Sequence, residues 1–505
     1  MSKYLFIFFS LILSSKIVSQ NSFISDSIDK YIEKGLKEWK IPGLAIVIVK
    51  DGKVVLRKGY GVKDIESNEK VNEDTHFFIA SNTKLFTGCA LAKLAYENKI
   101  NLNDPIVKYF PEYKLYDEIS TKLVTVKDML THRLGTKTFQ GDFTFWNSKL
   151  SREEIMNKMK FLKPNAGFRD SYGYCNSCFL VAGQVIEKAI GEKWEDHITS
   201  NFLLPIDMKS TYALSNDITS RSKNIASPYT TSYSNELKKV PYDVWDNLGP
   251  AASIVSNVVD LTKWLNFQLD SGKVNSKVVM PWKAMQMTRD ILNVTSSRKS
   301  SFYPVHIRGY GLGLFSSDYN GKQIYWHTGG AAGMVSNVCF VPEVKLGIAI
   351  LTNNDNQNFF EALRYQILDS YLNMPFIDRS KAMLVNHNTE MSNVIDEIKI
   401  LKKDADLYAG KVKSFDSFKG IYNNELYGQI ELTPINSGLK ISFEQHPNLS
   451  ANLYPMNEND WVLEYNNIEY GVFKTQFQKS EKGIKSLIIK MNEFVEIDSY
   501  EFIKI

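Results

Sequence analysis

Ser81 and Lys84 stand three residues apart at the start of an apolar stretch with helical spacing, SNTKLFTGCALAKLAYE. Residues i and i+3 share one face of a helix, so the serine hydroxyl and the lysine amine would lie one turn apart. A serine hydroxyl is a weak nucleophile without an adjacent base, and a lysine can be that base when burial lowers its pKa. The helix N-terminus also offers free N–H groups to a developing oxyanion. The pair therefore predicts acyl-transfer chemistry.

The S-x-x-K spacing is a weak signal by itself, because it recurs elsewhere in the chain. Only the copy at Ser81 opens a nearly all-apolar helical pattern, which must be buried. A buried lysine is costly unless it has a partner or a function, so this copy is the one expected to do chemistry. The other copies lie in polar loops, a terminal amphipathic helix or a β-rich region, and begin at Ser27, Ser67, Ser220, Ser296 and Ser437.

Two further motifs could complete such a site. Tyr174 and Asn176 precede a second apolar helix, where a tyrosine can relay a proton and an asparagine can bind a substrate amide. His327-Thr328-Gly329-Gly330 follows a strand-like run, and its glycines would let a substrate backbone approach while an N–H stabilises an oxyanion. Each motif alone also fits a turn or a surface tyrosine.

The elements that must position these residues follow from the apolar periodicity. Helical spacing predicts a region of helices, from Ser81 and at 27–39, 126–131, 177–189, 194–203, 258–269 and 358–372. Strand-like runs lie towards both ends of the first 375 residues, at 44–49, 53–56, 322–326, 335–341 and 346–351. This order predicts an α+β fold, with one antiparallel sheet built from both chain ends, flanked by helices, and an inserted helical region.

The rest of the chain changes character. Residues 376–412 are largely polar and charged and are interpreted as a linker. From Phe418 onward, short alternating runs are separated by Asn, Gly and Pro, which predicts a small all-β domain, either a sandwich or a barrel. We therefore expect domains at 20–375 and 413–505.

Residues 1–19 have the pattern of a cleavable signal peptide. One positive charge at Lys3 precedes an apolar run, and small residues lead to a cleavage point near Ser19. The run is shorter than the roughly 20 residues that span a bilayer, and no second long run follows. We expect a periplasmic or secreted protein with no stable membrane span.

Composition narrows the function classes. The 505 residues carry 60 Lys+Arg and 56 Asp+Glu, a net charge of +4 with no long basic run, which argues against nucleic-acid binding. The 7 histidines lack metal-binding spacing, and no dinucleotide loop is present, so we expect no metal and no cofactor. Cys175 and Cys178 could form a local disulfide, although free thiols are favoured. The expected partner is a small-molecule or peptide substrate, and the oligomeric state stays open.

In this order, the three motifs resemble those of the serine β-lactamase and penicillin-binding protein superfamily, S-x-x-K, Y-x-N and K-T-G. The resemblance is closest to class C β-lactamases and related esterases and D-amino-acid peptidases. It covers about residues 28–374, and the tail is similar to a β-barrel extension often found behind such domains. It implies a β-lactamase/DD-peptidase-like fold. Further similar segments lie at 78–81, 102–105, 129–132, 204–208, 249–256, 310–313 and 327–354.

The resemblance also implies roles for individual residues. Ser81 would be the acylated nucleophile, and Lys84 would be its base or part of a proton network. Tyr174 would assist proton transfer in acylation and deacylation. The N–H groups of Ser81 and Gly330 would form the oxyanion hole.

Asn176, Thr328 and Gly329 would hold the substrate by the same resemblance. His327 is a departure, because β-lactamases and DD-peptidases usually carry lysine at this position. A histidine is mostly neutral at pH 7, so it attracts a substrate carboxylate less strongly. This favours an esterase or peptidase over recognition of a β-lactam or a D-Ala-D-Ala peptide.

The resulting hypothesis is a secreted serine hydrolase that cleaves an ester or amide (a β-lactam, a D-amino-acid peptide or an ester) through an acyl-enzyme on Ser81. Two alternatives stay open. One is a penicillin-binding, DD-peptidase-like protein that acts on cell-wall peptides. The other is a catalytically inactive binding protein of the same fold.

Overall fold

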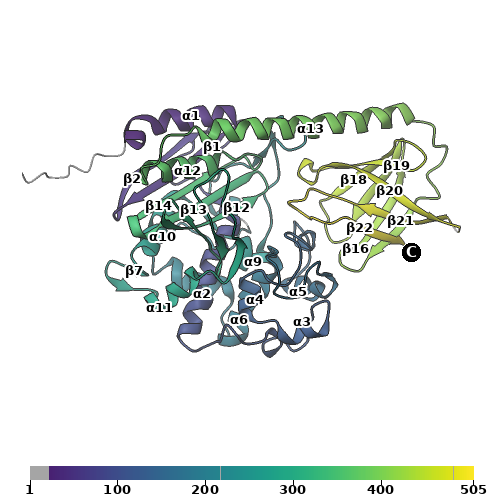
Figure 1. The fold of residues 1–505 in the computed structure, drawn as a ribbon. Coiled ribbons are helices and arrows are strands. Elements are labelled where there is room, and N and C mark those ends of the chain that lie inside the picture. Colours follow the sequence, from purple (N-terminus) through teal and green to yellow (C-terminus); the bar gives the residue numbers. More distant parts are fainter. Residues whose placement is uncertain (1–21, 217, 482) are drawn as a thin grey trace, which may run out of the picture.

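The computed structural model describes residues 22–216, 218–481 and 483–505, so the predicted signal peptide lies outside the described residues. Two bodies of different construction are joined by one long helix (Figure 1). The first combines an antiparallel sheet with helices, and the second is a closed β-barrel. None of the helices in the described ranges has the length and apolar character of a membrane span.

Eight strands form the sheet of the first body, in the order β2-β1-β14-β13-β12-β11-β10-β9. Strand β1 (Gly43–Lys50) pairs with β2 (Lys53–Gly61) on one side and with β14 (Leu346–Thr352) on the other. The two ends of this region therefore meet within one antiparallel sheet, which confirms the predicted α+β fold. The other strands are β9 (Asn293–Ser296), β10 (Arg308–Tyr310), β11 (Phe315–Tyr319), β12 (Lys322–Ala331) and β13 (Met334–Val341).

Helices cover both faces of this sheet. Successive side chains of a strand point to opposite faces, and β1 is apolar on both. Ile46 packs in a core shared with α1 (Ile28–Glu38) and α12 (Phe359–Tyr371). Its neighbour Val47 faces the opposite core, which contains α10 (Val258–Leu269). The continuous apolar run of β1 thus follows from its place between two layers of helices.

The inserted region is mostly helical. It lies against one end and one face of the sheet and carries the first and second motifs. The helix predicted at 194–203 is in two parts, since α7 ends at Ile198 and a wider π-helical turn continues from Thr199 to Leu203. The helices are α2 (Thr83–Tyr96), α3 (Glu118–Leu123), α4 (Val126–Leu130), α5 (Arg152–Lys158), α6 (Asn176–Ile190), α7 (Trp194–Ile198), α8 (Ile218–Arg221), α9 (Gly249–Ala252) and α11 (Trp282–Arg289).

Three pairs of short strands complete the first body. One pair helps to position the first motif, because it joins the segment before Ser81 to the segment after α9. The pairs are β3 (Phe77–Phe78) with β6 (Val255–Ser256), β4 (Tyr229–Thr230) with β5 (Lys238–Lys239), and β7 (Lys273–Val274) with β8 (Lys277–Val278).

The C-terminal domain is a closed barrel of eight antiparallel strands. Its first and last strands pair with each other and leave no open sheet edge at the closure. This confirms the predicted all-β domain, as a barrel. The strands are β15 (Gly420–Asn424), β16 (Gly428–Ile435), β17 (Gly438–Phe443), β18 (Ser450–Pro455), β19 (Asp460–Tyr465), β20 (Val472–Ser480), β21 (Gly483–Ile489) and β22 (Tyr500–Lys504).

Helix α13 (Arg379–Tyr408) occupies most of the segment that the sequence suggested as a linker, and it runs from the first body to the barrel (Figure 1). At its start, the buried Arg379 donates to Asp369 over 2.7 Å. Near its end, Leu401 packs against Val462 of the barrel. Most of the span between is exposed. A narrow apolar stripe does recur at helical spacing, at Met391, Val394, Ile398, Leu401 and Ala405, but the many charged residues between its members favour the interpretation as a linker.

The barrel also contacts the first body directly. The His446 ring stacks on Phe143 with a centroid separation of 3.9 Å, and its Nδ1 lies 2.9 Å from the Trp146 carbonyl oxygen. Lys137 forms an ion pair with Asp498 at 2.5 Å. The two bodies therefore share a packed interface, and barrel side chains can reach the inserted region.

Three buried carboxyl groups meet at this interface. Asp243 and Asp355 accept hydrogen bonds from the consecutive amides of Ala332 and Gly333, at 2.6 and 2.9 Å. Burial raises the pKa of Asp243 to about 7 and raises that of Asp355. Glu469, from the barrel, has its pKa raised well above the usual range by burial and by the other two carboxyl groups. No ion pair with a described lysine or arginine compensates them.

We expect Glu469→Gln to flatten the pH dependence of stability. The folded-state pKa of each group lies above its value in the unfolded chain, so stability falls as the pH rises from about 4 towards the raised folded-state pKa values. Removing one ionisable group should reduce the loss between pH 5 and pH 8 by about 1–3 kcal/mol, measured by urea unfolding. Glu431→Gln, exposed on β16, should keep the wild-type slope. Equal slopes for Glu469→Gln and wild type would contradict the expectation.

Candidate active site

Ser81 stands where a short 3₁₀ turn, η2 (Ala80–Asn82), passes into helix α2. Ala80 has a φ of 46°, a left-handed conformation that is uncommon for residues with a Cβ atom, so the chain turns sharply before Ser81. The sheet holds this turn, because Ser336 Oγ of β13 donates to the Ile79 carbonyl oxygen at 2.7 Å. The serine is therefore fixed relative to the sheet.

Lys84 is fully buried and has three acceptors for its three possible N–H donors. Its Nζ lies 3.0 Å from Ser81 Oγ, 2.6 Å from Asn176 Oδ1 and 3.0 Å from the carbonyl oxygen of Ala251. When the amine loses a proton, two hydrogen bonds can persist and the lone pair can accept from the Ser81 hydroxyl. This geometry suits proton transfer between serine and lysine.

The environment separates the pKa values of the two candidate bases. Burial lowers the pKa of Lys84 to about 7, against an opposing effect of the Asp142 carboxyl. Burial raises the pKa of the Tyr174 hydroxyl far above its usual range. The lysine amine lies 4.8 Å from the centre of the Tyr174 ring and 5.4 Å from that of Phe179. Near neutral pH the lysine is thus divided between its two forms, while the tyrosine keeps its proton.

Tyr174 and Asn176 sit at the start of α6, facing α2. The Tyr174 hydroxyl has no hydrogen bond of normal geometry within the described residues, but the nearby Ser81 hydroxyl opposes the rise that burial causes in its pKa. Asn176 connects Lys84 to Asp142, since its Nδ2 donates to Asp142 Oδ2 at 2.6 Å. Burial raises the pKa of Asp142 well above its usual range. Asn176 is thereby oriented with its oxygen towards the lysine.

His327 is buried, and its hydrogen bonds define a neutral tautomer. Nδ1 lies 2.8 Å from the Thr328 carbonyl oxygen, which can only accept, so Nδ1 carries the hydrogen. Nε2 is then free to accept from the Tyr310 hydroxyl at 3.0 Å. Burial, together with the nearby Lys84 amine, lowers the pKa of His327 to about 3. The position that usually carries a lysine in related enzymes is therefore uncharged at neutral pH.

The glycine-rich end of β12 faces Ser81 with one free edge. The pairing of β12 with β11 ends at Trp326, so residues 327–331 have no strand on that side within the described chain. Thr328 Oγ1 accepts from Asn337 Nδ2 at 2.9 Å. A Cβ atom on Gly329 would lie 2.0 Å from the Ile79 carbonyl oxygen, so only glycine lets the strand approach the turn before Ser81 this closely.

A cavity of about 560 Å³ opens at this point. Six of the eight predicted site residues line it, while Lys84 and Gly329 lie directly behind its wall. The six are Ser81, Tyr174, Asn176, His327, Thr328 and Gly330. No lysine or arginine is among the described lining residues, and Asp355 is the carboxylate among them.

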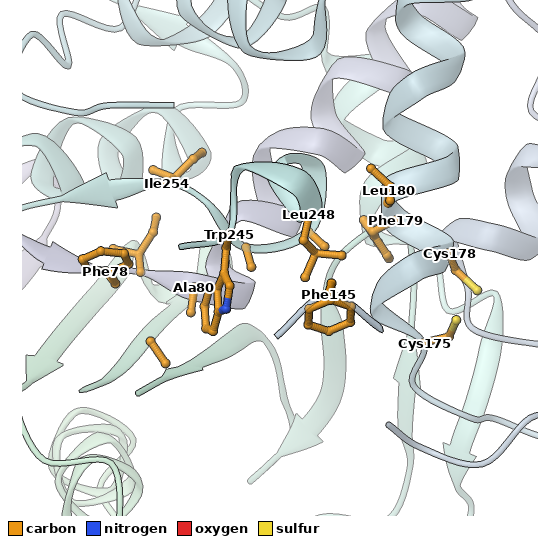
Figure 2. Packing of buried hydrophobic residues seen from close by; sticks show 14 of the residues in the cluster. Phe78, Ala80, Phe145, Cys175, Cys178, Phe179, Leu180, Trp245, Leu248 and Ile254 are labelled. Atoms are coloured by element: carbon orange, nitrogen blue, oxygen red, sulfur yellow. The ribbon is translucent and has the colours of Figure 1, made fainter. Parts of the chain in front are cut away.

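Aromatic side chains form much of the remaining wall. Figure 2 shows Phe145, Trp245 and Leu248, all cavity-lining residues, in the same buried cluster as Ala80. Other aromatic rings of the wall come from the inserted region, from the sheet, from helix α12 and from the barrel, namely Phe139, Trp146, Tyr172, Phe315, Phe360 and Phe494.

Sequence reasoning missed several residues of this site. Tyr310 lay in a family-like segment without an assigned role, and it proves to be the hydrogen-bond partner of His327. Asp142 belongs to no motif, although a left-handed Gly141 before it signals a tight turn. Asn492 and Phe494 come from the barrel, and no local pattern connects them to Ser81.

The cysteines and possible metal ligands add no further chemistry here. All four cysteines are buried free thiols, and Figure 2 shows Cys175 and Cys178 beside each other next to Phe179. The described residues contain no group of three or more His, Cys, Asp and Glu side chains arranged to hold a metal ion.

Comparison with known proteins gives a consistent result. Residues 28–372 match the Beta-lactamase protein family. Protein flp of Staphylococcus aureus (strain N315) is 30% identical over 352 residues, which cover 68% of this chain and 66% of that protein. Unguisins hydrolase ungD′ of Aspergillus campestris is 28% identical over 380 residues, covering 71% of this chain and 68% of that protein. The chain thus spans about two thirds of the length of these relatives.

The solved structures extend the likeness to both bodies. The octameric penicillin-binding protein homologue from Pyrococcus abyssi superposes with a TM-score of 0.60 at 21% identity, over 94% of this chain and 99% of that one. At this identity the likeness concerns the fold, including the barrel behind the first body.

The buried lysine predicts a specific pH profile for covalent labelling of Ser81. With Lys84 as base, labelling by a fluorophosphonate should rise about tenfold per pH unit up to about 7 and then level off. Lys84→Met should slow labelling by about 10²-fold or more. Lys93→Met, in the same helix but outside the cavity lining, should keep the wild-type profile. The labelling rate is measured by intact-mass spectrometry. A wild-type rate that rises only above pH 9 would exclude Lys84 as the base.

Proposed function

Because the chain belongs to the Beta-lactamase family, we propose that it is a serine hydrolase that cleaves an ester or amide through an acyl-enzyme on Ser81. The observation that carries the proposal is the 3.0 Å hydrogen bond between the buried Lys84 amine and the Ser81 hydroxyl at the wall of a cavity. The fold and the similarity to a relative named as a hydrolase support hydrolysis in general.

In the proposed acylation step, neutral Lys84 accepts the hydroxyl proton as Ser81 Oγ attacks the substrate carbonyl carbon. The oxyanion would be stabilised by the N–H groups of Ser81 and Gly330, two residues that line the cavity. Collapse of the tetrahedral intermediate breaks the bond to the leaving group, which takes up the proton from Lys84 directly or through the Tyr174 hydroxyl. Tyr174 suits a relay, since its raised pKa keeps it protonated.

Deacylation would use the same groups in reverse roles. A water molecule replaces the leaving group, gives its proton to neutral Lys84, either directly or relayed through the Tyr174 hydroxyl, and attacks the acyl carbon. Ser81 then leaves with a proton and the free acid is released. Asn176 would keep the lysine oriented through both steps and offer its Nδ2 side to the Asp142 carboxyl rather than to solvent.

The electrostatics of the cavity favour uncharged substrates. A substrate carboxylate would meet a neutral His327 and no described lysine or arginine on the cavity lining. Transfer of an unpaired carboxylate into such a site is costly. An ester or a peptide without a carboxylate next to the scissile bond is therefore proposed over a β-lactam or a cell-wall peptide ending in D-alanine. The signal-like residues 1–19 support action in the periplasm or outside the cell.

Replacement of the nucleophile tests the proposal directly. Ser81→Ala should lower kcat/KM for p-nitrophenyl butyrate by about 10³-fold or more, because no acyl-enzyme can form. Ser67→Ala changes an exposed serine with the same S-x-x-K spacing and should hydrolyse the ester like wild type. Undiminished hydrolysis by purified Ser81→Ala would refute the acyl-enzyme.

A matched pair of esters tests the charge preference. We expect p-nitrophenyl hexanoate to be cleaved with a kcat/KM about 10-fold or more above that of mono-p-nitrophenyl adipate, which has the same chain length but ends in a carboxylate too distant to attack its own ester rapidly. The measurement is initial rates at pH 7.5 and two ionic strengths. Equal rates, or a preference for the adipate, would show that the site accepts a carboxylate.

A further inference from the structure

The barrel supplies part of the wall of the candidate active site. A loop of residues 490–499, here called the barrel loop, joins β21 to β22. Two of its side chains, Asn492 and Phe494, line the same cavity as Ser81. The cavity is therefore incomplete without the C-terminal domain.

The Phe494 ring lies against the strand that faces the nucleophile. A Cβ atom placed on Gly330 would be 2.6 Å from Phe494 Cζ, so the ring sits directly on the backbone of β12. Its centroid lies 5.2 Å from that of Phe139 and 5.9 Å from that of Trp146, both in edge-to-face orientation. These contacts leave 41% of Phe494 exposed, so part of its ring can still contact a bound substrate.

The barrel loop is held firmly from both sides. Asn492 Oδ1 accepts from the N–H of Phe494 at 3.1 Å, and Asn492 Nδ2 donates to the Glu469 carbonyl oxygen at 2.9 Å. Further along the loop, Glu496 accepts from the N–H of Gly141 at 2.8 Å. The loop is thus fixed between its own domain and the turn that carries Asp142, and Phe494 is presented in one orientation.

The first body contributes a second phenylalanine ring, Phe139, which packs against Phe494. Phe139 has a φ of 63°, a strained conformation for a residue with a side chain, and its ring packs edge-to-face on both Phe494 and the catalytic candidate Tyr174. With Trp146, these rings make an apolar wall that runs from Tyr174 to Gly330. The described residues that line the cavity include no lysine, arginine or glutamate.

We propose that Phe494 is a specificity-determining residue which, with Phe139 and Trp146, forms a subsite for a bulky, uncharged, apolar acyl group. The inference rests on the proposed acyl-enzyme function. In that reaction the carbonyl oxygen must reach the N–H of Gly330, so the acyl chain begins beside the strand on which Phe494 lies. Aromatic rings bind apolar chains and other rings through their faces and edges, without needing charge.

The subsite is tested with two p-nitrophenyl esters that share a leaving group but differ in acyl size, the acetate and the benzoate. Wild type should prefer the benzoate. Phe494→Ala should lower kcat/KM for the benzoate by about 10-fold and leave the acetate within about 2-fold. Phe494→Leu, which keeps an apolar side chain, should fall between. Ile421→Ala, at a barrel position of equal exposure (41%), should match wild type with both esters.

The possible results distinguish a failure of the subsite proposal from a failure of the proposed function. An unchanged benzoate-to-acetate ratio in both Phe494 variants, with melting temperatures like that of wild type, would overturn the subsite while leaving the acyl-enzyme intact. An equal loss for both esters would overturn it too, since a merely structural role has no size dependence. If wild type cleaved neither ester and Ser81 took no label from a fluorophosphonate, the proposed function would fail, and the subsite with it.

Discussion

The site in the first body depends on the hydrogen bonds that the buried Lys84 amine makes. An amine removed from water must find hydrogen-bond partners within the protein, and here the three partners come from η2, α6 and α9. Helices α6 and α9 are far from Lys84 in the sequence, so the helical region must assemble before the lysine has all its partners. The same burial that makes the group costly also brings its pKa near neutrality, where it can take a proton from Ser81.

Close contacts between backbone segments fix the positions of the site residues. Gly329 lets β12 contact the turn before Ser81, and Gly313 lets the segment after β10 contact the Lys84 carbonyl, because a Cβ atom at either position would lie within 2.2 Å of a carbonyl oxygen. The nucleophile and the opposing strand edge are thereby fixed without any side chain between them. The barrel extends the same principle, since its loop is bonded to the turn that carries Asp142.

Much of the fold and of the site could be predicted from local patterns, because the residues concerned can be identified from the residues next to them in the sequence. The apolar run of β1, the helix after Ser81 and the glycines after Thr328 each carry a short-range signal that survives in the structure. The roles of Asp142 and Phe494 could not be predicted, and helix α13 was missed because its apolar stripe is narrow and is surrounded by charged residues. The helix is held by contacts at its two ends, and the two side chains gain their places only through tertiary packing of distant segments.

Titration of the Lys84 amine tests the central claim most directly. Lysine labelled with ¹³C at Cε reports the protonation of each amine by NMR, and Lys84→Met identifies the signal that belongs to the buried group. The account predicts a midpoint at about 7 for this signal in the folded protein. A midpoint near the ordinary lysine value of about 10.4 would contradict it, because the amine would then be fully charged at neutral pH and could not accept the Ser81 proton.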